Sequence, residues 1–199
     1  MLAHYLKGFG MGLGLIIAIG AQNAHVLRMG LQRQHVLLTV ATCIACEIML
    51  ISAGVAGIGT LIERNPALLA LARWGGAAFL AWYGLRSWRS ALSPHELKAA
   101  AASAMGTGKA LTTVLAVTLL NPHCYLDTVV LLGAVGGQQG AGKWWFAAGA
   151  MTAAVAWFTT LGFGARLLSP WFARPLSWRV LDGLIGVVMF ALAISLLAG

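Results

Sequence analysis

Two carboxylates of this chain lie inside long apolar runs. Glu47 is near the middle of the run 36–59, and Asp127 follows the pair Asn121-Pro122 in a later run. A carboxylate at the centre of a bilayer costs about 2.5 kcal/mol or more, so we interpret both as functional. The charge-assisted hydrogen bonds of a guanidinium or ammonium group would compensate that cost. The two acids therefore predict a site for a cationic guest.

Glu47 and Asp127 are also candidates to exchange a proton during a transport cycle. Burial favours the neutral form of a carboxyl group, and so does a neighbouring like charge. The alternative is a structural ion pair with Arg73, the one arginine placed well inside an apolar run. The sequence leaves these roles open beside substrate binding.

Amides and helix-breaking residues interrupt two of the apolar runs. Gly20 precedes the adjacent amides Gln22 and Asn23 in the first run, and Asn121-Pro122 lies near the middle of the fourth. Proline removes an amide donor and clashes with the carbonyl one turn earlier. Broken helices at matching places in two halves mark transporter binding sites. The predicted substrate site therefore also includes Gln22, Asn23, Asn121 and Pro122. The alternative is that the asparagines only bridge helices by hydrogen bonds.

The chain is too apolar for a soluble domain. Of its 199 residues, 60% are hydrophobic and only 9% are charged. Each apolar run has roughly the 20 residues that a helix needs to cross about 30 Å of hydrocarbon. We therefore expect an all-α integral membrane protein with six transmembrane helices and no soluble module. The predicted spans are 8–27, 36–59, 68–88, 110–135, 144–165 and 178–198.

The basic residues are distributed unevenly among the connections. Nine of the 13 lysines and arginines lie in the first, third and fifth connections or in the span ends that border them. By the positive-inside rule, those connections are cytoplasmic and both termini lie outside. The excess charge is thus a topology signal, and no basic patch with interleaved aromatics predicts nucleic-acid binding. The nine are Arg28, Arg33, Arg86, Arg89, Lys98, Lys109, Arg166, Arg174 and Arg179.

The two halves of the chain echo one another. Asn23-x-His25 in the first half returns as Asn121-x-His123 in the second. Because each half holds three spans, the second half enters the membrane from the opposite face, which predicts two inverted three-helix repeats with broken helices 1 and 4. We expect a single transmembrane transporter domain over 1–199, with repeat one at about 1–90, a cytoplasmic loop at about 90–108 and repeat two at about 109–199.

Enzyme and metal signatures do not occur in the sequence. The chain contains neither H-E-x-x-H nor G-x-S-x-G, so we expect a protein that is not an enzyme and needs no cofactor. Cys43 and Cys46 form a C-x-x-C without a second pair. Two small packing residues on one helix are the expected role, with zinc or redox chemistry as the alternative.

Two motifs resemble those of the LysE-type exporters of lysine and arginine, and weaker similarity extends over essentially the whole chain. They are Gly20-Ala21-Gln22-Asn23 with Val26-Leu27-Arg28, and Asn121-Pro122-His123-Cys124-Tyr125-Leu126-Asp127. The resemblance implies a multi-pass protein of the bacterial inner membrane that exports basic amino acids, driven by an ion gradient, as a homodimer. It also implies an aspartate where this chain has Glu47, and no site role for His25.

The leading prediction is a secondary exporter of arginine, lysine or a similar amino acid, whose partners are that substrate and the lipid bilayer. The asparagines and the backbone freed at the breaks would hold the α-carboxylate and amine, Glu47 and Asp127 would hold the side chain, and the halves would rock to alternate access. The alternative is an exporter of neutral amino acids or of a metal cation with the same architecture.

Overall fold

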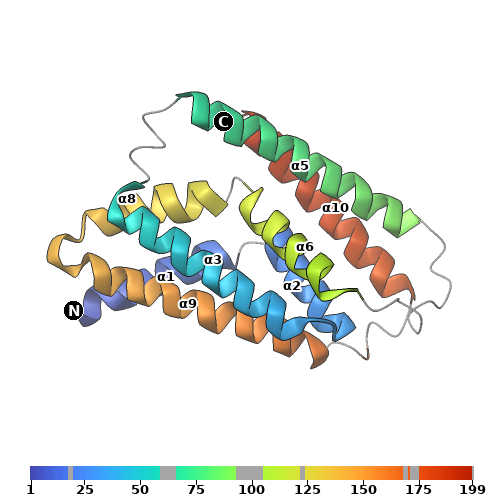
Figure 1. Ribbon diagram of the computed structural model, residues 1–199, viewed down its shortest axis with the longest axis horizontal. Helices are drawn as coiled ribbons and strands as arrows, with labels where there is room; N and C mark the ends of the chain where they lie inside the picture. Colours follow the sequence, from blue (N-terminus) through green and yellow to red (C-terminus); the bar gives the residue numbers. More distant parts are fainter. Residues whose placement is uncertain are drawn as a thin grey trace.

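The computed structural model describes residues 1–17, 20–58, 66–92, 105–121, 124–167, 170 and 175–198. All of the elements in these ranges are helical, as the apolar runs predict (Figure 1). In chain order they are α1 (Leu2–Ile16), α2 (Ala21–Gln32), α3 (Val36–Ala56), α5 (Pro66–Leu92), α6 (Thr107–Leu119), the π-helix η2 (Tyr125–Leu131), α8 (Leu132–Gly137), the short 3-10 helix η3 (Gly140–Gly142), α9 (Lys143–Gly164) and α10 (Pro175–Ala198).

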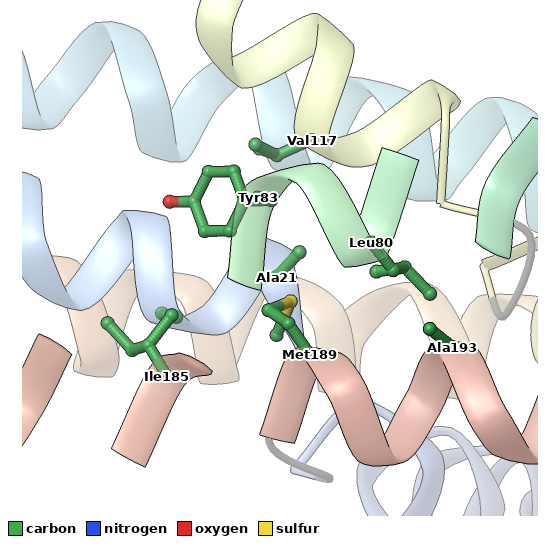
Figure 2. Packing of buried hydrophobic residues seen from close by; sticks show 8 residues of the cluster. Ala21, Leu80, Tyr83, Val117, Ile185, Met189 and Ala193 are labelled. Carbon is green, nitrogen blue, oxygen red and sulfur yellow. The ribbon is translucent and has the colours of Figure 1, made fainter. Parts of the chain in front are cut away.

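The helices form two groups that meet along α2 and α6. In the first group α1 lies along α9, and α3 contacts α9, α6, η2 and α8. In the second group α5 and α10 lie side by side, as Figure 1 shows in green and red. Figure 2 shows the cluster that joins the groups, in which Ala21 and Val117 meet Leu80 and Met189. This apolar contact places the α5 and α10 pair against the two helices that flank the predicted breaks.

The apolar runs differ in how they fold. Within the described residues, α3 and the segment Gly140–Leu167 are each long and apolar enough to cross a bilayer. The first run is a bent pair, since α1 and α2 meet at 79° and together make a third candidate. The fourth run is divided into shorter apolar helices. The number of spans, six in the sequence prediction, stays a prediction.

Glycines allow the closest helix crossings. A Cβ atom on Gly54 of α3 would lie 2.8 Å from the Val129 carbonyl oxygen, and one on Gly133 would lie 2.7 Å from the Gly54 backbone. A Cβ atom on Gly12 of α1 would lie 2.9 Å from Cα of Ala150 in α9. Side chains at these positions would force the helices apart, so small residues fix the spacing around the site helices.

The basic ends of the helices gather at one end of the bundle. The end of α2, the end of α5 and the start of α6 line one cavity there, and His35 Nε2 lies 2.5 Å from the Met105 carbonyl oxygen. At the other end, His4 Nδ1 lies 3.1 Å from Gln139 Oε1, which ties α1 to the turn before α9. This arrangement fits the predicted sidedness, in which the first end is cytoplasmic.

Candidate functional site

The first break lies between Ile16 and Ala21, just before the two predicted amides. Gly20 is extended, with φ −129° and ψ 179°, and α2 begins at the next residue. Asn23 in the first turn of α2 donates from Nδ2 to the Ile16 carbonyl oxygen at 2.6 Å. Its Oδ1 accepts a hydrogen bond from Trp157 Nε1 of α9 at 3.1 Å. Asn23 therefore closes the break and fastens it to a neighbour, which favours the bridging interpretation for this residue.

The second break follows α6, which ends at Leu119. Asn121 is buried at 6% exposure, and its carbonyl oxygen accepts from the Cys124 amide at 3.1 Å. The helix resumes as η2 at Tyr125, with Asp127 in its first turn. The predicted site residue Pro122 lies outside the described residues. Single π turns within helices are frequent at functional sites, because the wider turn redirects side chains.

The two breaks adjoin. A Cβ atom on Gly20 would lie 4.0 Å from the side-chain nitrogen of Asn121. Ala21, which follows Gly20, packs in the same buried cluster as Val117 of α6 (Figure 2). The broken backbones of the first and fourth runs therefore meet inside the bundle.

Glu47 lies beside this meeting point, in the middle of α3, and is 3% exposed. Its carboxylate accepts from Cys124 Sγ at 3.6 Å and from Thr128 Oγ1 at 3.4 Å. The side chain of Gln22 also lies next to this carboxylate. Among the side chains that the structure describes, no lysine or arginine comes within salt-bridge distance of Glu47. The side chain of Arg73, the alternative structural partner, lies outside that part of the structure.

Asp127 occupies the same region with more exposure than Glu47. It is close enough to Glu47 for the two negative charges to repel each other. The carboxylates predicted from the sequence therefore lie within electrostatic range of each other, although 80 positions separate them in the chain. Two acids at one site, one enclosed and one more open, suit a guest with a diffuse positive charge.

Several buried polar atoms on the helices around the breaks have no partner within the described residues. They are Gln22 Nε2, His25 Nε2, Thr39 Oγ1 and Thr118 Oγ1. An unpaired buried polar group costs about 1–3 kcal/mol, so such groups persist where another molecule or water pairs with them in some state. All four lie on α2, α3 and α6, the helices that surround the breaks.

Comparisons with known proteins cover almost the entire chain. Residues 13–199 match the family described as LysE type translocator. The protein belongs to this LysE family. The chain is 46% identical to the arginine exporter protein ArgO of Yersinia enterocolitica over 98% of this chain and 97% of that protein. It is 42% identical to the ArgO of Serratia proteamaculans over 98% and 97%. A putative amino-acid transporter of Aeromonas salmonicida, YggA, is 46% identical over 100% and 98%. No solved structure matches the chain.

This LysE family chain also contains a buried ion pair between residues far apart in the sequence. Asp182 of α10 accepts from Arg28 of α2 at 3.3 Å and from Ser90 Oγ of α5 at 2.6 Å. Asp182 is fully buried, while the Arg28 side chain is 30% exposed. The acid therefore joins α10 to α2 and α5, and no local spacing could have identified this partner.

Other residues around the LysE family site carried only weak sequence signals. Cys124 and Thr128 hydrogen-bond Glu47, yet both looked like ordinary parts of an apolar run. Their positions one turn apart, on the same side of the segment after Asn121, were the available hint. Cys43 and Cys46 are buried and free, with Cys43 inside an apolar cluster, in agreement with a packing role.

Proposed function

We propose that the protein is a secondary transporter that exports basic amino acids, arginine foremost, from the bacterial cytoplasm across the inner membrane. The observation that carries the proposal is the enclosed Glu47 carboxylate, which is held by neutral donors and lies beside two adjoining helix breaks. The relatives named as arginine exporters support arginine as the substrate.

The helix contacts support an inverted-repeat architecture with six spans. The first span would be α1 with α2 and the fourth α6 with η2 and α8. Span one lies along α9 of the second half, and span four lies along α3 of the first half. The corresponding helices α5 and α10 pair with each other, as do α3 with α9 and α2 with α6. Each of these contacts maps onto an equivalent contact when the two halves of the chain are interchanged. A two-fold axis in the membrane plane that relates the halves would produce this pattern.

In the proposed site the two carboxylates receive the cationic side chain. A guanidinium has five N–H donors and no acceptor, so it can pair with Glu47 and Asp127 together. The pairing offsets the repulsion between the two acids and the cost of burying them. Either acid is also the proposed carrier of a coupling proton, because a proton and a cationic side chain compete for the same oxygen atoms.

The polar groups at the breaks would hold the other end of the amino acid. Gln22 Nε2 has no partner among the described residues and can donate to the α-carboxylate. Asn121, buried beside Gly20, and the backbone freed by Pro122 would serve the α-amino group. Asn23 would contribute by fixing the shape of the first break.

The competing guests are a neutral amino acid or a metal cation. A neutral substrate would leave the buried Glu47 carboxylate without a positive partner among the described side chains, which disfavours it. A divalent metal would need several hard ligands in one place, and within the described residues no group of three or more His, Cys, Asp or Glu is arranged to hold one. The homodimer implied by the resemblance remains a prediction, to be tested by the mass of the detergent-solubilised protein.

Counterflow in proteoliposomes tests the proposal. Vesicles loaded with unlabelled arginine should accumulate labelled arginine, and external lysine should compete while leucine and divalent metal ions should not. The Glu47→Gln/Asp127→Asn double variant should lose exchange while it still inserts in the vesicles. Leucine competing as well as lysine would reassign the substrate, and full exchange by the double variant would remove the two acids from the site.

A further inference from the structure

A cavity of about 470 Å³ opens where α2, α5 and α6 meet, at the end that the basic residues assign to the cytoplasm. We call it the basic vestibule. Arg28, Arg86 and Lys109 line it, and none of its described lining residues is acidic. A cavity on the entry side of a cation exporter would thus repel the side chain of its own substrate. The positive lining therefore favours an anionic part of the ligand over its cationic side chain.

Among the described residues, two of these three positive charges have no counter-ion. Arg28 is paired with Asp182 at 3.3 Å. Arg86 and Lys109 are exposed, and no carboxylate of the described residues lies within salt-bridge distance of either. α6 also begins here, and its N-cap residue Gly106 supplies no side-chain cap. The free N–H groups of that helix end add to the attraction for an anion.

The inner wall of the basic vestibule is buried and polar. His25 lines the cavity at 3% exposure, and its Nε2 has no partner among the described residues. Ser87 and Tyr83 line it as well, at 4% and 9% exposure. Figure 2 shows the Tyr83 ring in the apolar cluster with its hydroxyl directed away from Leu80 and Ala193. A ligand in the cavity would therefore meet polar side chains, and at least one of their hydrogen-bonding atoms, His25 Nε2, is left unpaired by the described residues.

A line of polar groups leads from the basic vestibule to Glu47. His25 and Gln22 lie three residues apart on one face of α2, and Gln22 lies beside the Glu47 carboxylate. A rise of about 1.5 Å per residue separates them by roughly 4.5 Å along the helix axis. This spacing lets one amino acid extend from the vestibule toward the carboxylates.

We propose that the basic vestibule binds the α-carboxylate of the amino acid on its way to Glu47. The carboxylate is the only anionic group of a basic amino acid, so Arg86 and Lys109 orient the molecule with its cationic side chain pointing inward. This inference rests on the proposed export of basic amino acids and adds to it a selectivity step. The vestibule accepts amino acids and discriminates against amines that carry the same cation without a carboxylate.

Competition by decarboxylated arginine tests this step, because that amine keeps the guanidinium and lacks the carboxylate. In arginine counterflow, unlabelled arginine should compete at concentrations at least about ten-fold below those of the amine. Lys109→Gln and Arg86→Gln should raise the half-inhibitory concentration of arginine by roughly ten- to a hundred-fold and leave that of the amine unchanged. Lys109→Arg and Arg86→Lys, which retain the charge, should restore most of the discrimination.

Arg166→Gln is the matched control, since Arg166 is exposed at the same end but lines a different cavity. This substitution should leave the half-inhibitory concentrations of arginine and of the amine unchanged. Parallel shifts for arginine and the amine, or no shift for either, would overturn the proposal. Inorganic phosphate that blocks arginine while the discrimination stays intact would assign the cavity to phosphate and overturn it too. If Arg86→Gln fails to accumulate, Lys109→Gln decides alone. A wild-type protein without arginine exchange would instead refute the proposed function.

Discussion

Thr128 Oγ1 donates to Glu47 Oε2 at 3.4 Å across 81 positions of the chain. Cys124 Sγ donates to the other carboxylate oxygen at 3.6 Å. Both donors are neutral, so dipoles surround the buried acid, and no positive partner stands next to it among the described side chains. A cationic substrate would then supply the first full positive charge at this position, which makes the charge of Glu47 the feature to test.

Glu47→Gln should reduce arginine transport while the protein still accumulates. Loss of a charge-assisted contact corresponds to about 1.5–3 kcal/mol, or roughly ten- to a hundred-fold in affinity. Asp127→Asn should act in the same direction, and Glu47→Asp should be milder because it keeps the charge. Export rate divided by membrane protein level is the measurement. Failure of Glu47→Gln to accumulate would favour the structural ion pair with Arg73.

Asn23→Ala should lower the melting temperature of the detergent-solubilised protein. The substitution removes the bond to the Ile16 carbonyl and the bond from Trp157, each worth about 0.5–1.5 kcal/mol. Trp157→His, which keeps a ring N–H donor, should be milder than Trp157→Phe, and Trp157→Phe milder than Asn23→Ala. An unchanged melting temperature with abolished transport would show instead that Asn23 contacts the substrate.

Removing either partner of the Arg28–Asp182 ion pair should destabilise the protein, and the two losses should differ. Arg28→Met strands a fully buried carboxylate, whereas Asp182→Asn leaves a partly exposed arginine. We expect Arg28→Met to lower the free energy of unfolding more than Asp182→Asn does. Its effect should not exceed the ~3–5 kcal/mol lost when one partner of a fully buried pair is removed. The Arg28→Met/Asp182→Leu double variant should regain much of the loss. Additive losses in thermal unfolding would show that the pair does not act as a unit.

Gly54→Ala should disturb the site from a distance. The added methyl group would lie 2.8 Å from the Val129 carbonyl oxygen, so α3 and η2 must separate. Gly14→Ala is the matched control, because a Cβ atom there meets nothing within 4 Å. We expect lower stability and transport for the first variant and no loss for the second. Equal behaviour of the two variants in melting and transport assays would contradict a close α3 crossing.

Cysteine labelling tests the sidedness. Gln138→Cys, at the exposed turn after α8, should react with an impermeant maleimide in intact cells. Arg166→Cys, at the exposed turn after α9, should react only after permeabilisation. The native cysteines are buried and should contribute little background. The reverse pattern would invert the topology and place the basic vestibule outside.

The sequence was sufficient for the features that depend on local backbone chemistry. Gly20 and the Asn121-Pro122 pair predicted interruptions, and α1 ends at Ile16 while α6 ends at Leu119. The start of α3 coincides with the start of its apolar run at residue 36. These features follow from residues a few positions apart, and a single sequence reports those directly.

Features set by packing between distant helices could not be predicted in the same way. The partner of Asp182 is 154 positions away, and it is defined only once α10 lies against α2. Asn23 looks the same in the sequence whether it binds a substrate or closes a break, and the choice depends on Trp157 of α9. The π-helix carries no periodic signal of its own, because seven residues are too few to distinguish its turn from that of an α-helix.

The number of residues in η2, and not only their identity, determines which side chains point toward the site. A π turn holds one more residue than an α turn, and this extra residue helps to direct Thr128 toward Glu47. Deleting one residue between Thr128 and Leu131 would let the segment rewind as an α-helix. The segments before and after η2 would keep nearly the same relative orientation, because the deletion removes the residue that the wider turn accommodates, whereas the side chains within the turn would change direction. Such a protein would keep every acid discussed above, but the side chains of this segment would line the substrate site differently.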